Sequence, residues 1–180
     1  MKKVYQKIID KDHGDCMQAV VASLFDLRLE AVPRFIDIGS GWFIIMMKFF
    51  KDRGYDICTI DKHQHQYKGS DFLKKVAYFD GGIDGYFYAS VKSKLFEGGG
   101  HAVIVDKDLK VIHDPNPNGL YLNAKPEDIE DIMVVHDMII GKTGKIFTQE
   151  EWDKCHKKEK DENTYRVKFD DNNNVIGSES

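Results

Sequence analysis

The sequence contains little cysteine and little proline, with three cysteines and four prolines in 180 residues. Cys16, Cys58 and Cys155 are far apart, and an odd, widely spaced set is a poor basis for a disulfide framework. No two of them form a Cys-x-x-Cys pair, so the usual sequence signal of a structural zinc site is missing. We therefore expect three free thiols in a reducing, cytoplasmic compartment.

Long hydrophobic runs and an excess of positive charge are also missing. The most apolar segment, residues 43–50, contains Lys48 and is far too short to span a membrane. The first residues, Met-Lys-Lys, are not followed by the apolar stretch of a signal peptide. The net charge of −4 argues against a dedicated nucleic-acid-binding protein, which is usually strongly basic. We expect no nucleic-acid partner and no membrane partner.

What remains is typical of a globular α+β protein, with 42% apolar and 31% charged residues and no internal repeat. The order of elements, helices first and then mostly antiparallel strands, predicts N-terminal helices packed on an antiparallel sheet. We expect one domain over residues 1–169, and a flexible polar tail over 170–180. Predicted helices span about 16–25, 28–32, 40–53, 126–132 and 148–157, and predicted strands span about 55–60, 85–93, 101–106, 109–114 and 133–139.

Cys16 stands at the predicted start of a helix, directly after Asp15, which is a favoured N-cap residue. A thiol in this place lies near the positive end of the helix dipole, which favours the thiolate. The interior of the helix, residues 19–25, is apolar on nearly all sides and would hold the sulfur in place. Cysteine is also a common core residue, and position alone favours that simpler interpretation.

Two predicted strands bring a histidine and a carboxylate together. If Lys107 and Asp108 form the tip of a hairpin, His101 faces Asp114 on the same side of the ribbon. The same register places His113 on the other side, where it would be structural or exposed. The register depends on the length of the loop, because a three-residue loop reverses which residues share a face.

A thiol, a histidine and a carboxylate form the set that cysteine hydrolysis requires. The histidine takes or shares the thiol proton, and the carboxylate orients the histidine. The developing oxyanion also needs hydrogen-bond donors. The backbone N–H of Cys16 is one candidate donor. The side chain of Gln6 is the other, although a surface glutamine is an equally good interpretation.

Two blocks of sequence resemble a known superfamily. Residues 14–19 (Gly-Asp-Cys-Met-Gln-Ala) and 32–35 (Val-Pro-Arg-Phe) look like the opening of papain-like cysteine peptidases. Residues 99–105 and 111–117 resemble the histidine strand of that superfamily and the Asp-Pro that ends the next strand. The most similar members are small proteins of bacteria and bacteriophages, distantly similar to bacteriocin-processing (double-glycine) peptidases. Residues 142–180 have no recognised counterpart.

The resemblance implies a papain-like fold with a Cys-His-Asp triad. It makes Cys16 the nucleophile, His101 the base and Asp114 the orienting acid. Gln6 matches the oxyanion glutamine less closely, since the family often places it six residues before the cysteine and here the separation is ten.

The function expected is that of a cytoplasmic cysteine hydrolase, a peptidase or an isopeptidase/amidase, acting on an unidentified peptide or protein without a cofactor. The same triad would also serve an acyltransferase or transglutaminase-like enzyme. A non-catalytic binding or inhibitory module that keeps the fold is the third interpretation.

His63 and His65 suggest a metal site only weakly, because alternating histidines in a polar loop are usually solvated.

Overall fold

The computed structural model describes residues 1–62, 69–137, 166–169 and 175–179. The chain forms two compact units, Met1–Ile139 and Ile140–Ser180. In the second unit, β6 (Arg166–Phe169) pairs with β7 (Val175–Glu179) in an antiparallel ribbon. The strand β7 lies within the segment that the sequence analysis assigns to a tail. The predicted helix 148–157 and the histidines at 63 and 65 lie outside the described residues.

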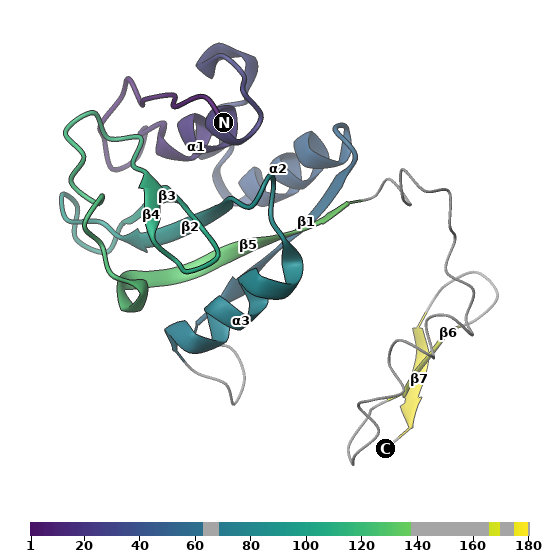
Figure 1. The fold of residues 1–180 in the computed structure, drawn as a ribbon. Helices are drawn as coiled ribbons and strands as arrows, with labels where there is room; N and C mark the ends of the chain where they lie inside the picture. Colours follow the sequence, from purple (N-terminus) through teal and green to yellow (C-terminus); the bar gives the residue numbers. More distant parts are fainter. Residues whose placement is uncertain (63–68, 138–165, 170–174, 180) are drawn as a thin grey trace. The chain divides into compact units, whose positions relative to one another are not determined.

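The first unit is built on an antiparallel sheet of five strands in the order β1-β5-β2-β3-β4 (Figure 1). The three central strands bury most of their side chains, because helices lie on both faces of the sheet. The expected α+β class is therefore correct. The strands are β1 (Tyr55–Asp61), β2 (Phe87–Lys92), β3 (Gly100–Val105), β4 (Val111–His113) and β5 (Ile129–Asp137).

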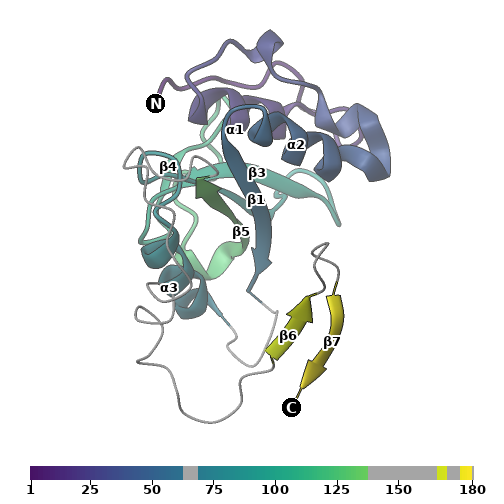
Figure 2. The ribbon, with the colours of Figure 1, turned by 90° about the vertical axis from the view of Figure 1, so that its right-hand side faces the viewer.

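Two helices cover one face of this sheet. They are α1 (Cys16–Leu24) and α2 (Trp42–Lys51), joined by the short 3-10 helices η1 (Leu29–Ala31) and η2 (Phe35–Gly41) (Figures 1 and 2). Residues 19–22 of α1 are wholly inaccessible to solvent, as the apolar sequence of this segment predicts. Residues 20–22 pack with Met46 and Phe50 of α2 against Ala102 and Ile104 of β3. Burial on this scale, at about 1.5–3 kcal/mol for each large side chain, fixes the position of Cys16 at the start of α1.

A third helix, α3 (Ser70–Asp80), lies against the opposite face and has no counterpart in the sequence analysis. Leu73 and Ala77, four residues apart, are fully buried against the sheet, and Phe72 and Val76 pack beside them partly buried. This narrow apolar stripe among charged residues is a weak helical signal. The helix ends at Gly81, whose φ of 81° is the left-handed conformation that favours glycine.

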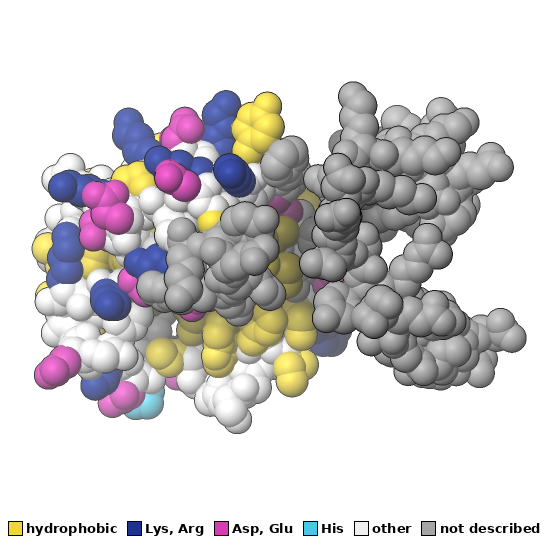
Figure 3. All heavy atoms as spheres, turned by 90° about the horizontal axis from the view of Figure 1, so that it is seen from below, with side chains coloured by type: hydrophobic (Ala, Val, Ile, Leu, Met, Phe, Trp, Pro, Cys, Tyr) yellow, Lys and Arg dark blue, Asp and Glu magenta, His cyan; other side chains and the backbone are white. Residues whose placement is uncertain are grey.

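Seen from the side of α3, charged side chains of both signs lie beside hydrophobic ones on the surface (Figure 3). Among the described residues, no helix has both the length and the apolar character needed to cross a bilayer.

The turn between β3 and β4 is longer than predicted. The sequence analysis places Lys107 and Asp108 at a two-residue tip, but Leu109 is also part of the loop, with a φ of 62°. The N–H of Asp106 donates to the carbonyl of Lys110 across this three-residue loop, at 3.0 Å. The side chain of Leu109 is fully buried, so its packing offsets the cost of a left-handed backbone.

The longer turn, together with a bulge, changes the register. The observed pairs are Val105 with Val111 and Ile104 with His113. The predicted pairing of His101 with Asp114 is therefore wrong, as is that of His113 with Ala102. Asp114 instead follows the end of β4, and its side chain reaches His101 from the turn.

The segment around residues 126–132 is a second correction. The sequence analysis predicts a helix there, but the 3-10 helix η3 (Pro126–Asp128) is short and β5 begins at Ile129. Ile129 and Ile132 are both fully buried in the sheet core. An apolar pair three residues apart fits a helix by its spacing, but pairing with β1 and β2 decides in favour of the strand.

The carboxylate of Asp15 gives a test of how the N-terminal segment is held. It is buried and accepts hydrogen bonds from the N–H groups of Lys7, at 3.1 Å, and Ile8, at 2.9 Å. We expect Asp15→Ala to lower the free energy of unfolding by about 2 kcal/mol, because two N–H groups lose a charged acceptor. Asp15→Asn should cost less, since an amide oxygen still accepts. Urea unfolding followed by circular dichroism measures both. The matched control is Asp12→Ala, at an exposed position, and an equal loss there would contradict the assignment.

Candidate active site

Cys16 is the first residue of α1 and is half-buried. Asp15 occupies the N-cap position, as predicted, but its carboxylate points to Lys7 and Ile8 and makes no hydrogen bond to the helix. The first N–H groups of α1 therefore have no capping side chain. Gly14 allows the chain to turn tightly here, because a Cβ at this position would lie 2.4 Å from the carbonyl oxygen of Asp10.

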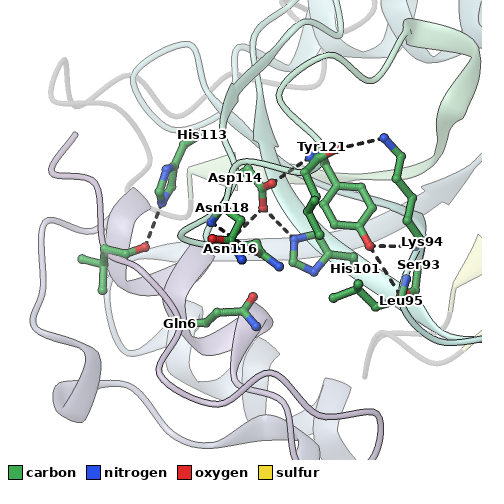
Figure 4. A network of polar contacts seen from close by, with 12 residues as sticks. Gln6, Ser93, Lys94, Leu95, His101, His113, Asp114, Asn116, Asn118 and Tyr121 are labelled. Carbon is green, nitrogen blue, oxygen red and sulfur yellow. Dashed lines mark hydrogen bonds and ion pairs between the residues drawn. The ribbon is translucent and has the colours of Figure 1, made fainter.

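His101 and Asp114 form a buried pair. The imidazole Nε2 lies 2.8 Å from Oδ1 of Asp114, and both side chains are less than 10% exposed (Figure 4). The carboxylate accepts two further hydrogen bonds, from the backbone N–H of Asn116 at 2.9 Å and that of Tyr121 at 2.8 Å. Three donors thus hold the negative charge in a region that water does not reach, which is what a buried carboxylate requires.

The same contacts set the protonation of the pair. Burial opposes ionisation of Asp114, but the hydrogen bonds from His101, Tyr121 and Asn116 outweigh it and lower the pKa of the carboxyl. Burial likewise opposes protonation of His101. Hydrogen bonds with Asp114 and with the side chain of Cys16, together with the charges of both groups, outweigh burial and raise the pKa of His101 to about 9. Since Nε2 is bound to Asp114, Nδ1 is the ring nitrogen left for Cys16.

Tyr121 holds the plane of the imidazole. Its ring stacks on that of His101 with centroids 4.2 Å apart and planes 19° from parallel. Its hydroxyl accepts a hydrogen bond from the backbone N–H of Lys94, at 2.7 Å. The backbone holds one end of the tyrosine ring and the Lys94 N–H holds its hydroxyl, so the ring restricts rotation of the His101 imidazole (Figure 4). Sequence reasoning misses Tyr121, since an aromatic residue after a turn carries no distinctive signal.

Gln6 lies beside the pair. It is buried, and its backbone N–H donates to the carbonyl of Pro115, at 2.9 Å. It lines a small cavity together with Cys16 and His101, so the structure brings all four predicted site residues into one region. Its Nε2 donates to the carbonyl of Ile8, at 3.1 Å, and an amide carries a second N–H. Its Oε1 is buried and has no hydrogen-bond partner among the described residues.

His113 lies apart from these residues. Its Nε2 is 2.8 Å from the carbonyl of Val4, and its ring meets that of Tyr5 edge to face. Burial lowers the pKa of His113, so the ring is neutral near pH 7 and its N–H donates to Val4. This role fits the structural one expected for His113. The contact fastens the N-terminal segment to the end of β4.

A larger cavity, of about 700 Å³, is also lined by Cys16 and His101. Trp42, at the start of α2, forms part of its wall, and Tyr88 and Ser90 of β2 line it together with Asp131 of β5. The sequence analysis does not identify the last three, which are ordinary strand residues in the sequence. No group of three or more potential metal ligands occurs in the part of the chain that the structure describes.

Comparison with models of known protein families gives no match, and neither a curated protein nor a solved structure is significantly similar to this chain. Function is therefore inferred from the residues of the chain itself.

The pKa of His101 tests the pair directly. In Asp114→Asn the imidazole keeps a hydrogen-bond acceptor but loses the adjacent negative charge, so burial weighs more heavily. We expect the pKa to fall from about 9 by at least ~1 unit. NMR titration of the histidine ring signals measures this. The exposed variant Asp12→Asn should leave the value unchanged, and an unchanged value in Asp114→Asn would refute the pairing.

Proposed function

We propose that this protein is a cysteine hydrolase with a papain-like fold, a peptidase or an isopeptidase/amidase that uses a Cys16-His101-Asp114 triad. The observation that carries the proposal is the position of His101, whose ring is hydrogen-bonded to a buried carboxylate and lines the same two cavities as Cys16. The raised pKa keeps His101 protonated near neutral pH, so that the imidazolium can hold a negative charge on the sulfur and later give a proton to a leaving amine.

Acylation starts from this ion pair. The thiolate of Cys16 attacks the carbonyl carbon of an amide, and the electron pair of the C=O bond moves to oxygen. The backbone N–H of Cys16 at the start of α1 and the second N–H of Gln6 are the donors for this oxyanion. The C–N bond then breaks while His101 gives its Nδ1 proton to the departing amine, leaving a thioester on Cys16.

Deacylation reverses the roles. His101, now neutral, takes a proton from a water molecule as the oxygen attacks the thioester carbon. The C–S bond breaks, the carboxylic acid leaves, and the thiolate–imidazolium pair returns. Asp114 remains ionised throughout and keeps the ring oriented, so that Nδ1 faces the sulfur. Tyr121 contributes by restricting the ring to this orientation.

Thiol labelling tests the activated state. With iodoacetamide at pH 7, Cys16 should react at least ~10-fold faster than Cys58, and His101→Ala should remove this advantage. Cys58 is a suitable internal reference, because burial and the nearby Asp80 and Asp56 raise the pKa of its thiol. Peptide mapping by mass spectrometry gives both rates in one sample. Labelling of Cys16 at the rate of Cys58 would refute an activated thiolate and favour a binding module.

Capture of the acyl-enzyme tests turnover. The protein is incubated with a pool of synthetic peptides, quenched in acid and analysed by mass. We expect an acyl adduct on Cys16 and new peptide termini, both lost in Cys16→Ala because the nucleophile is missing. Asp12→Ala, at an exposed site, serves as the control and should behave as the wild type. Product formation that persists in Cys16→Ala would contradict the mechanism.

A further inference from the structure

The cavity of about 700 Å³ beside Cys16 has a floor made by the sheet. Tyr88 and Ser90 of β2 and Asp131 of β5 line it, on the same sheet face that α1 and α2 cover elsewhere. Met17 and Trp42 from the two helices form apolar walls. A group seated in this cavity would therefore lie next to the sulfur of Cys16 and above a polar floor.

Asp131 is the one carboxylate among the described residues that line the cavity. It is half-buried, and the hydroxyl of Ser90 donates to its Oδ2. Within the described chain no cation pairs with it, although Lys11 and His101 also line the cavity. Lys11 is exposed, and His101 is already paired with Asp114. Burial raises the pKa of Asp131, and so do the charges of Asp61 and Glu130. A carboxylate in this setting is stabilised by an incoming positive charge.

Tyr88 is a second, independent sign of a ligand. Only 6% of the residue is exposed, and it lines the cavity. Within the part of the chain that the structure describes, its hydroxyl makes no hydrogen bond. Burial, followed by the charges of Cys16 and Asp131, raises the pKa of Tyr88 well above its usual value, so the phenol stays neutral. The hydroxyl has no partner within the described chain and belongs to a residue that lines the cavity, so it is available to bond a ligand or water there.

We infer that this cavity is the specificity subsite of the proposed hydrolase and binds a basic substrate side chain, whose ammonium or guanidinium group meets Asp131 and the hydroxyl of Tyr88. The inference builds on the proposed function and names its substrate class. The alkyl part of a lysine or arginine side chain would lie along Met17 and Trp42, while its charged end reaches the floor. An acidic side chain would face Asp131 and be rejected by its charge.

Binding to Cys16→Ala tests this subsite without any need for turnover. The probes are three N-acetylated tripeptide amides with one lysine, at the first, second or third position, and alanine elsewhere. Three matched peptides carry norleucine, which has the alkyl chain of lysine without its amine. In NMR titrations we expect at least one lysine peptide to bind about tenfold more tightly than its norleucine partner.

The variants are added to the Cys16→Ala background. Asp131→Asn should abolish the lysine preference, because the amide is neutral but still accepts the Ser90 hydrogen bond. Tyr88→Phe removes only the hydroxyl and should reduce the preference. If thermal melting shows that Asp131→Asn is unfolded, the result for Tyr88→Phe decides the test. The matched control is Asp108→Asn, an exposed carboxylate that does not line the cavity, and it should leave the preference intact.

The outcomes separate this inference from the proposed function. Equal binding of lysine and norleucine peptides, tighter binding of norleucine, or a preference that survives Asp131→Asn would overturn the basic subsite. None of these outcomes affects the labelling of Cys16. A lysine preference with an unreactive Cys16 would instead support the subsite and refute the hydrolase.

Discussion

The buried carboxylate of Asp114 is the constraint on which the site depends. An ionised group with less than 3% exposure is stable only when its oxygens are fully engaged, and here an imidazole and two backbone N–H groups engage them. The turn after β4 must therefore fold back so that Asn116 and Tyr121 present their N–H groups. That same turn places the ring of Tyr121 on His101. The hydrogen bonds that the buried Asp114 carboxylate requires thus determine the path of the turn after β4 and the orientation of the His101 ring.

The N-terminal segment joins the two halves of the site. Gln6 bonds to Pro115 beside the carboxylate, and Val4 bonds to both His113 and Ser23. Asp15 fastens the other end of this segment at the start of α1. Because Asp15 is used in this way, its carboxylate does not cap the helix. A short irregular segment thereby bonds to both the start of the Cys16 helix and the end of the hairpin that bears His101, and adds to the direct packing of α1 on β3.

Local signals in the sequence predict the helix and the strand that bear the site residues better than they predict the register that brings those residues together. The start of α1 follows from Asp15 and the apolar residues after it, and β3 follows from its apolar run. The register of β3 and β4 does not follow, because it depends on the buried side chain of Leu109, which stabilises a left-handed backbone at a residue that rarely adopts it. His101 and Asp114 still meet, since a side chain at the end of a strand has more freedom than one within the ladder. Tyr88, Asp131 and Tyr121 are invisible in the sequence, because their roles come from long-range packing.

The hydrogen bond between Val4 and His113 joins residues separated by 109 positions. Such a contact closes a very long loop, and the chain-entropy cost of closing it is recovered only when both ends are already in place. The helix that bears the thiol is synthesised early, and the hairpin that bears the imidazole emerges much later. Cys16 and His101 can therefore come together only after the chain has been synthesised through the hairpin, well after the helix of Cys16 has emerged.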